Sequence, residues 1–220
     1  MNKYNILLDK LKNKENFALS RFNDGEVIGM ARPGSVVARG DQLVNPTLSK
    51  ALIDAIKHEQ EDYWVGLPCS LCWPEHFSYA SNLVRKDYEY KTCAVVLTNR
   101  NWRNFIEEFP KTIQGRKVVW VSGEDQTFDS LSFKVDKSIF VKSKDGWSSY
   151  EDIKDSYKEL APNSIVILSC GPLSRVLAKE WFEKRQDLTI LDVGSVWDPF
   201  TRDVWHNCHT GNLSPCKECS

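Results

Sequence analysis

The 220-residue sequence predicts an α/β fold: a Rossmann-like, doubly wound, mostly parallel sheet with helices on both faces. Two observations carry this prediction. Short, continuous apolar runs such as 164–168 are typical of strands buried on both faces of a parallel sheet. These runs alternate with longer segments whose apolar residues recur at helical spacing, as expected for helices that connect parallel strands.

The first half of the chain supplies three helices and three strands. Residues 2–15 and 74–88 have helical patterns. Asn45-Pro46 begins another helix, because Asn is a good N-cap and proline suits a first helical turn. The strands expected here are 17–20, 63–67 and 93–97.

The second half continues the alternation. A helix over 99–109 is expected to end before Pro110, and Ser149 caps a helix that runs to about residue 160. Gly171-Pro172 opens the last helix. The strands expected here are 117–121, 138–142, 164–168 and 188–191. We therefore expect one domain over 1–198 and a Cys/His-rich tail over 199–220 that packs on it.

Composition excludes several classes of protein. Lys and Arg number 29 against 30 Asp and Glu, and this balance argues against a nucleic-acid binder. No apolar run approaches the ~18 residues of a membrane-spanning helix. The N-terminal run Ile6-Leu7-Leu8 is interrupted by Asp9, unlike a signal-peptide core. We predict a cytoplasmic protein whose seven cysteines are reduced or bound to metal.

An acidic segment, SRFNDGE at 20–26, follows the first strand directly. Asp24 and Glu26 flank Gly25, so a tight turn would point both carboxylates into one site, with Arg21 close by. Carboxylate oxygens suit a divalent cation, and a guanidinium pairs with phosphate oxygens. The alternative is an ordinary solvated Asn-Asp-Gly turn.

Other candidates follow later strands, whose carboxyl ends border the ligand site in such sheets. Gly171 and Pro172 open a helix whose N-terminus could bind phosphate or ribose, although a plain tight turn explains them equally well. Further candidates are Glu124 for a hydroxyl or as a base, Arg100 for diphosphate, Gly194 for the nucleotide, and one of Asp192 and Asp198 for the acceptor. A solvated loop glutamate, a surface arginine and helix-capping aspartates are the alternatives for these.

Two C-x-x-C pairs suggest a structural zinc site. Cys69 and Cys72 follow the strand at 63–67, and Cys216 and Cys219 lie near the C-terminus. Four thiolates complete a tetrahedral zinc shell, and such a site would tether the polar tail across the fold. Unlinked thiols or a disulfide are the alternatives.

The SRFNDGE run resembles the R-(Y/F)-G-D-G-E signature of the GT-D glycosyltransferases, a family first catalogued as a domain of unknown function. Five further segments resemble the family in the same order: VGLP at 65–68, VSGED at 121–125, DGWSSYEDI at 145–153, CGPLSRVLAKEW at 170–181 and LDVGSVWD at 191–198. Asn23 replaces a glycine of the signature, and Ser195 stands where the family often has histidine.

The resemblance implies a metal-dependent glycosyltransferase. Such an enzyme moves a sugar from a UDP-sugar donor to a hydroxyl of a glycan or glycoconjugate. Asp24 and Glu26 would hold Mn²⁺ or Mg²⁺ with the diphosphate, assisted by Arg21 and Gly25. The cation would stabilise charge on the leaving group as a Lewis acid. One alternative is a module, stabilised by the zinc site, that binds a nucleotide or glycan without turnover. The other is a nucleotide-sugar hydrolase.

Overall fold

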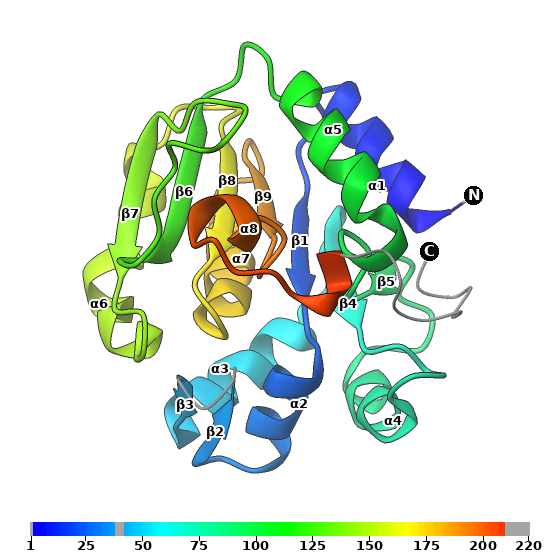
Figure 1. The fold of residues 1–220 in the computed structure, drawn as a ribbon. Coiled ribbons are helices and arrows are strands. Elements are labelled where there is room, and N and C mark those ends of the chain that lie inside the picture. The colour runs from blue at the N-terminus through cyan, green and yellow to red at the C-terminus, as the bar shows by residue number, and fades with distance from the viewer. Residues whose placement is uncertain (1, 38–41, 210–220) are drawn as a thin grey trace.

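The computed structural model describes residues 2–37 and 42–209. Seven strands form one sheet in the order β5-β4-β1-β9-β8-β6-β7, and each pairing within it is parallel (Figure 1). The strands are β1 (Ala18–Arg21), β4 (Tyr63–Leu67), β5 (Lys91–Cys93), β6 (Val118–Gly123), β7 (Lys137–Val141), β8 (Ile165–Ser169) and β9 (Thr189–Asp192). The predicted fold class is confirmed.

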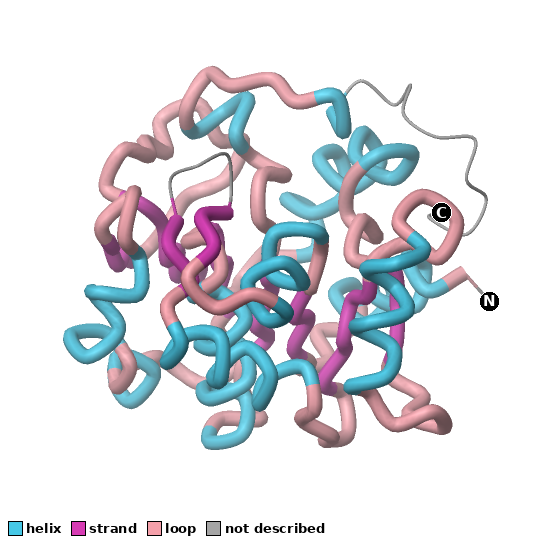
Figure 2. Tube along the Cα trace, turned by 90° about the horizontal axis from the view of Figure 1, so that it is seen from below, coloured by secondary structure: helices cyan, strands magenta, loops and turns pink. Residues whose placement is uncertain are grey.

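Helices cover both faces of this sheet (Figures 1 and 2). One apolar core includes residues of α1 (Lys3–Lys12) and α5 (Trp102–Thr112). The opposite core includes residues of α2 (Asp24–Ala31), α3 (Pro46–Ile56), α4 (Pro74–Leu83), α6 (Tyr150–Ile153) and α7 (Leu173–Lys184).

Successive strand residues serve opposite cores. In β6, Val119 and Val121 belong to the α3 and α7 side, whereas Val118 and Trp120 belong to the α1 and α5 side. Because side chains alternate along a strand, burial on both faces requires an unbroken apolar run. This explains why the strands lack the alternating pattern of a half-exposed sheet.

The strand order places a topological switch point near the middle of the sheet. From β1 the chain moves outward through β4 to β5, then crosses to β6 and β7 on the other side. β8 and β9 then fill the space between β6 and β1. In doubly wound sheets, ligands bind beyond the carboxyl ends of the strands at such a point, which here lies between β1 and β9.

Several predicted boundaries are wrong. The run at 93–97 is not a strand, because β5 ends at Cys93 and residues 94–97 form turns. These turns are buried, so their side chains are as apolar as those of a strand. Pro110 lies inside α5, near its C-terminal end, where burial of Phe109 and Ile113 holds the last turn against the core.

The helix predicted over 149–160 is also wrong as a single element. It consists of a 3-10 turn at Gly146–Ser149, the short helix α6, and a second 3-10 turn at Ser156–Glu159. The helices predicted over 2–15 and 74–88 are shorter in the structure, where α1 ends at Lys12 and α4 ends at Leu83.

The sequence prediction missed α2, a hairpin and two short helical elements near the C-terminus. The antiparallel hairpin of β2 (Ser35–Val37) and β3 (Gln42–Val44) follows α2, which was itself read as a turn. Near the C-terminus, α8 (Asp198–Thr201) begins at the predicted domain boundary, and the 3-10 turn η4 (Asn207–His209) lies within the predicted Cys/His-rich tail. Their short length leaves no periodic signal in the sequence.

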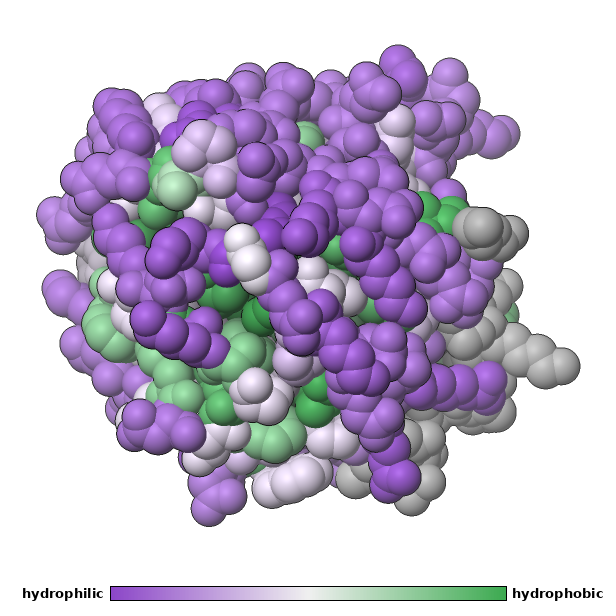
Figure 3. Space-filling view, turned by 90° about the horizontal axis from the view of Figure 1, so that it is seen from above, coloured by the Kyte–Doolittle hydropathy of each residue, from purple (hydrophilic) through white to green (hydrophobic). Residues whose placement is uncertain are grey.

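No helix within residues 2–37 and 42–209 is long and apolar enough to span a lipid bilayer. Viewed from above, at the amino-terminal edge of the sheet, the surface is largely hydrophilic, and its most extended apolar area lies at the lower left of the view (Figure 3).

Candidate functional site

The acidic segment forms the first turn of α2, not a free loop. Asn23 precedes the helix, and its backbone N–H donates to Glu26 Oε2 at 3.0 Å. This contact satisfies one of the amides that a helix N-terminus leaves unpaired. Glu26 is therefore turned inward and buried, whereas Asp24 is half-buried.

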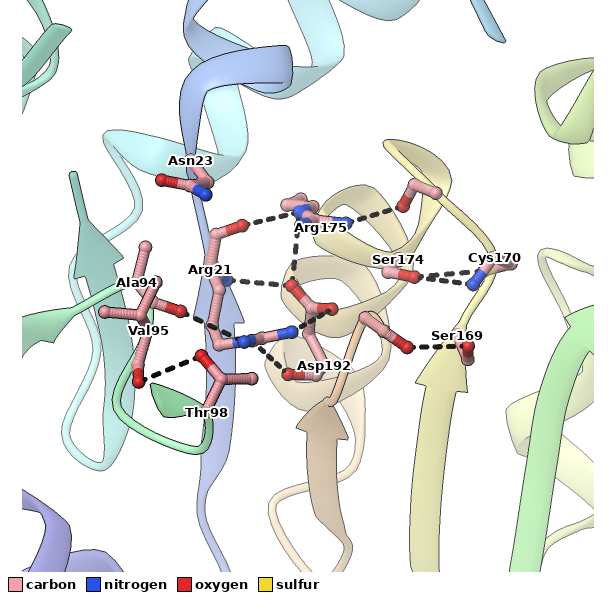
Figure 4. Close-up of polar contacts among 12 residues, drawn as sticks. Arg21, Asn23, Ala94, Val95, Thr98, Ser169, Cys170, Ser174, Arg175 and Asp192 are labelled. Carbon is pink, nitrogen blue, oxygen red and sulfur yellow. Dashed lines mark hydrogen bonds and ion pairs between the residues drawn. The ribbon is translucent and has the colours of Figure 1, made fainter. Parts of the chain in front are cut away.

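A buried group of four charged side chains lies beneath this turn. Asp192, at the end of β9, is fully buried between Arg21 and Arg175 (Figure 4). Arg175 Nε lies 3.1 Å from Asp192 Oδ2, and Arg175 Nη2 lies 3.2 Å from Glu26 Oε1. The two guanidinium and two carboxylate groups balance, which is the condition under which buried charges are tolerated.

Arg21 is directed into this group. Its Nε donates to the carbonyl of Asp192 at 2.6 Å, and its Nη1 donates to the carbonyl of Ala94 at 3.0 Å. Its Nη2 lies 3.9 Å from Asp192 Oδ1. Arg21 thus connects the ends of β1 and β9 with the turn after β5. Because two side-chain hydrogen bonds and one ion pair direct the guanidinium inward, its contribution to a ligand would be mainly its charge.

Arg175 connects three segments at the same edge. Its Nε donates to the carbonyl of Arg21 at 2.6 Å and its Nη1 to the carbonyl of Gly171 at 2.7 Å, in addition to its contacts with Asp192 and Glu26. Burial tends to lower the pKa of Arg175, but Asp192 and Glu26 outweigh it and the net shift is upward. For Arg21, burial prevails and the pKa lies below its usual range.

Two cavities open above this charged group. The larger has a volume of about 710 Å³ and includes Arg21, Asp24 and Gly25 in its lining. The smaller has a volume of about 210 Å³ and is bordered by Gly171 and Gln42. The cavities share Glu26, Arg175, Gly194, Ser195, Asp198 and Arg202. They therefore form two lobes that meet at the carboxyl ends of the strands.

The structure thus brings together some of the predicted residues. Arg21, Asp24, Gly25, Glu26 and Gly194 line the larger lobe. Gly171 lines the smaller lobe, and Asp198 lines both. Asp192 lies beneath the lobes, inside the buried charged group.

The other predicted residues lie elsewhere. Arg100 is exposed on the 3-10 turn before α5, and Glu124 is exposed after β6. Pro172 is buried as the N-cap of α7. These three residues lie outside the lining of both lobes.

Three lining residues have roles that the sequence prediction missed. Asp125, next to Glu124, lines the larger lobe and pairs with Arg202 at 3.4 Å. Arg175 lies within the helical pattern of α7, where its burial leaves no sequence signal. His206 comes from the segment beyond residue 198, which the sequence alone treats as a separate tail.

Gly171 has a positive φ of 63°, a conformation that L side chains rarely adopt. A Cβ at this position would contact Gln42, whose side-chain amide also donates to the carbonyl of Ser143. A bulky substitution at Gly171 would therefore disturb the hairpin as well as a ligand, so it cannot isolate nucleotide binding.

The carboxylates can be tested for their fit to a divalent cation. Within the described part of the chain, no three His, Cys, Asp or Glu side chains gather into a metal site. Mg²⁺ commonly binds through one or two carboxylates together with substrate phosphates. Asp24 and Glu26 both line the larger lobe, and Asp24 fits that mode of binding directly. Glu26 fits it only through oxygens that also accept from Asn23 and pair with Arg175. The two carboxylates do not fit a site made from protein ligands alone.

The predicted zinc ligands are only partly within the described residues. Cys69 and Cys72 lie on the loop after β4, where the backbone N–H of Cys72 donates to Cys69 Sγ at 3.4 Å. Cys216 and Cys219 lie outside the described residues. The zinc site stays a prediction.

Gly194 offers a direct test of how tightly Arg21 is packed. Its φ is 52°, and a Cβ there would collide with Arg21 Nη2. Gly194→Ala should lower the free energy of unfolding by at least about 2 kcal/mol, through backbone strain and displacement of the guanidinium. Thermal and denaturant unfolding would measure the loss.

Gly34→Ala is the matched control for that substitution. Gly34 also has a positive φ, 93°, but a Cβ there would meet nothing within 4 Å. Gly34→Ala should therefore lower the free energy of unfolding through backbone strain alone, without a collision. Equal losses in the two variants would show that Arg21 is not held tightly against Gly194.

No protein-family model matches the sequence. No curated protein matches it either. Solved structures do match. A structure described as "A New Glycosyltransferase (DUF1792) from Streptococcus sanguinis" is 20% identical, with a TM-score of 0.69, over 88% of this chain and 80% of that one.

Two further solved structures agree with it. One is a selenomethionine-substituted domain of unknown function 1792, 18% identical with a TM-score of 0.68. The other is described as a highly conserved domain of unknown function 1792 with "a distinct glycosyltransferase fold", 18% identical with a TM-score of 0.66. Each match covers 86% of this chain and 76% of the other. The predicted resemblance is thus confirmed at the level of structure: this chain has the fold of the DUF1792 glycosyltransferase domains.

Proposed function

We propose that this protein is a metal-dependent glycosyltransferase that moves a sugar from a UDP-sugar to a hydroxyl of a glycan or glycoconjugate. The observation that carries the proposal is the two-lobed cavity at the switch point of the sheet, where Asp24 and Glu26 start a helix directly after β1. The likeness of the whole fold to DUF1792 glycosyltransferase domains supports it.

The two lobes suggest how the donor lies. The nucleoside would occupy the smaller lobe beside Gly171, and the diphosphate would lie at the junction near Arg175 and Arg202. The transferred sugar would extend into the larger lobe. Guanidinium groups stabilise the negative charge of a diphosphate, and more strongly in a partly buried site than in water.

Asp24 and Glu26 would hold a divalent cation against the diphosphate. When bound, that cation would supply Lewis-acid stabilisation of the charge that develops on the leaving UDP. Arg175 would keep Glu26 in place through the 3.2 Å ion pair and would add positive charge at the junction. The polar lining of the larger lobe would orient the acceptor hydroxyl.

The proposal is tested by measuring UDP release. The protein would be incubated with Mn²⁺ and UDP-glucose, UDP-galactose or UDP-N-acetylglucosamine, with and without sugar acceptors. We expect UDP release that depends on the acceptor and is abolished by a chelator. Release that is independent of acceptor would indicate a hydrolase. Binding of UDP without any release would indicate a non-catalytic module.

A further inference from the structure

An imidazole–carboxylate pair lines the larger lobe. His206 Nε2 lies 2.7 Å from Asp198 Oδ2, and both side chains are largely buried, with exposed fractions of 11% and 9%. Asp198 also borders the smaller lobe, so the pair stands beside the junction between the lobes. Asp198 starts α8, and His206 follows five residues after that helix ends.

A second histidine holds this segment in place. The backbone N–H of His206 donates to His209 Nδ1 at 3.1 Å, and His209 Nε2 bonds to the carbonyl of Ser195 at 2.8 Å. His209 must therefore be neutral, with its proton on Nε2. It is also buried against Trp102, with ring centroids 5.0 Å apart. These contacts hold the segment against the loop after β9, and so keep His206 beside the larger lobe.

We propose that His206 is the catalytic base of this protein and that the larger lobe is the site where the acceptor hydroxyl is deprotonated. The inference rests on the proposed glycosyl transfer. The acceptor oxygen forms a bond to the anomeric carbon as the bond from that carbon to the phosphate oxygen breaks. The electron pair of that bond leaves with UDP, and the hydroxyl proton passes to the His206 imidazole.

Asp198 is the positioning residue in this arrangement. By accepting a hydrogen bond from Nε2–H, it fixes the orientation of the ring and stabilises the imidazolium that forms.

The electrostatic surroundings of His206 are mixed in sign. The other charged or titratable groups that line the same lobe are Arg21, Asp24, Glu26, Asp125, Arg175, Arg202 and Cys208. Among the described residues that line the two lobes, His206 is the only imidazole. Histidine is the side chain that most often acts as a general base in proteins.

The test compares His206→Asn with wild type, using UDP-glucose and Mn²⁺ and either p-nitrophenyl glucosides or water as acceptor. We expect UDP release to fall by about a hundredfold or more, while calorimetry shows unchanged affinity for UDP. The wild-type rate should decline toward acidic pH as the imidazole is protonated, and this decline should be absent in His206→Asn.

Two further variants separate a base from a merely structural residue. Added imidazole should restore part of the rate of His206→Gly, because it can occupy the vacated space and accept the proton. Asp198→Asn should lower the rate of UDP release without weakening UDP binding, because the ring loses the carboxylate that orients it at 2.7 Å. His76→Asn, on α4 away from both lobes, should behave like wild type.

The outcomes distinguish this inference from the proposed function. If wild type neither binds UDP nor releases it from any nucleotide sugar, the proposed function fails, and the inference fails with it. If wild type is active but His206→Asn keeps the wild-type rate and pH profile, only the assignment of the base is wrong. A loss in His206→Asn that is accompanied by lost UDP binding, without imidazole rescue of His206→Gly, would reduce His206 to a structural role.

Discussion

Arg175→Met should lower the free energy of unfolding by about 3–5 kcal/mol, the range found when one partner of a buried ion pair is removed. The substitution leaves Asp192 fully buried and Glu26 largely buried, without the guanidinium that lies 3.1 Å and 3.2 Å from them. It also removes donors to the carbonyls of Arg21 and Gly171. Denaturant unfolding and the melting temperature would measure the effect.

Two comparisons make this experiment specific. Arg103→Met, on the exposed side of α5, removes the same charge from the surface and should change stability by less than about 0.5 kcal/mol. Arg175→Lys keeps the charge but loses the planar guanidinium group, so its free energy of unfolding should lie between those of Arg175→Met and wild type. If Arg175→Met were as stable as Arg103→Met, the four-residue charged group would not be a determinant of stability.

Asp24→Asn should lower the rate of UDP release by about a hundredfold or more, on the scale of losing one electrostatic contact in the transition state. The amide is nearly the same size but lacks the negative charge that would attract a divalent cation. Because Asp24 is half-buried and outside the four-residue charged group, the fold should be retained. Calorimetry should show that Mn²⁺ no longer strengthens UDP binding.

Asp9→Asn is the matched control for this substitution. Asp9 is exposed on α1 and lines neither lobe, so the variant should bind UDP with the same dependence on Mn²⁺ as wild type. Asp24→Asn with full activity and undiminished metal dependence would contradict the placement of the cation.

Glu26→Ala is a less specific experiment than the sequence suggests. From the acidic segment alone, one expects a loss of activity with little effect on folding. In the structure Glu26 accepts from the Asn23 backbone and balances Arg175. Its removal would therefore destabilise the start of α2 and the buried charges as well, and activity and stability would fall together.

Sequence alone determined the fold class and the neighbourhood of the site. Continuous apolar runs such as those of β6 and β8 are required by burial on both faces, and that requirement is local enough to be read from the chain. The ends of parallel strands meet at one edge, so Arg21, Asp24, Glu26 and Gly194 could be assigned to one site before any coordinates. The order of the family-like segments pointed to the same fold.

Tertiary structure decided which charged side chains belong together. Arg175 looks like one more polar residue of an amphipathic helix, and only the packing of α7 beside β1 and β9 buries it against Asp192. Similarly, Glu124 and Asp125 are adjacent in sequence, and the path of the chain after β6 alone places Asp125 in the lobe and leaves Glu124 outside. Burial and pairing of charges depend on contacts between distant segments, which no local pattern records.

Contacts between distant segments also explain why the sequence did not predict that residues beyond 198 line the site. Residues beyond 198 have no periodicity that predicts where they lie, yet His209 bonds to the loop after β9 and brings His206 to Asp198. The sequence determined that an acidic segment lies at the carboxyl edge of the sheet, because that position depends only on where a strand ends; that the segment starts a helix was shown by the structure. The imidazole that completes the lobe was placed by hydrogen bonds between segments, and such bonds exist only once the chain has folded.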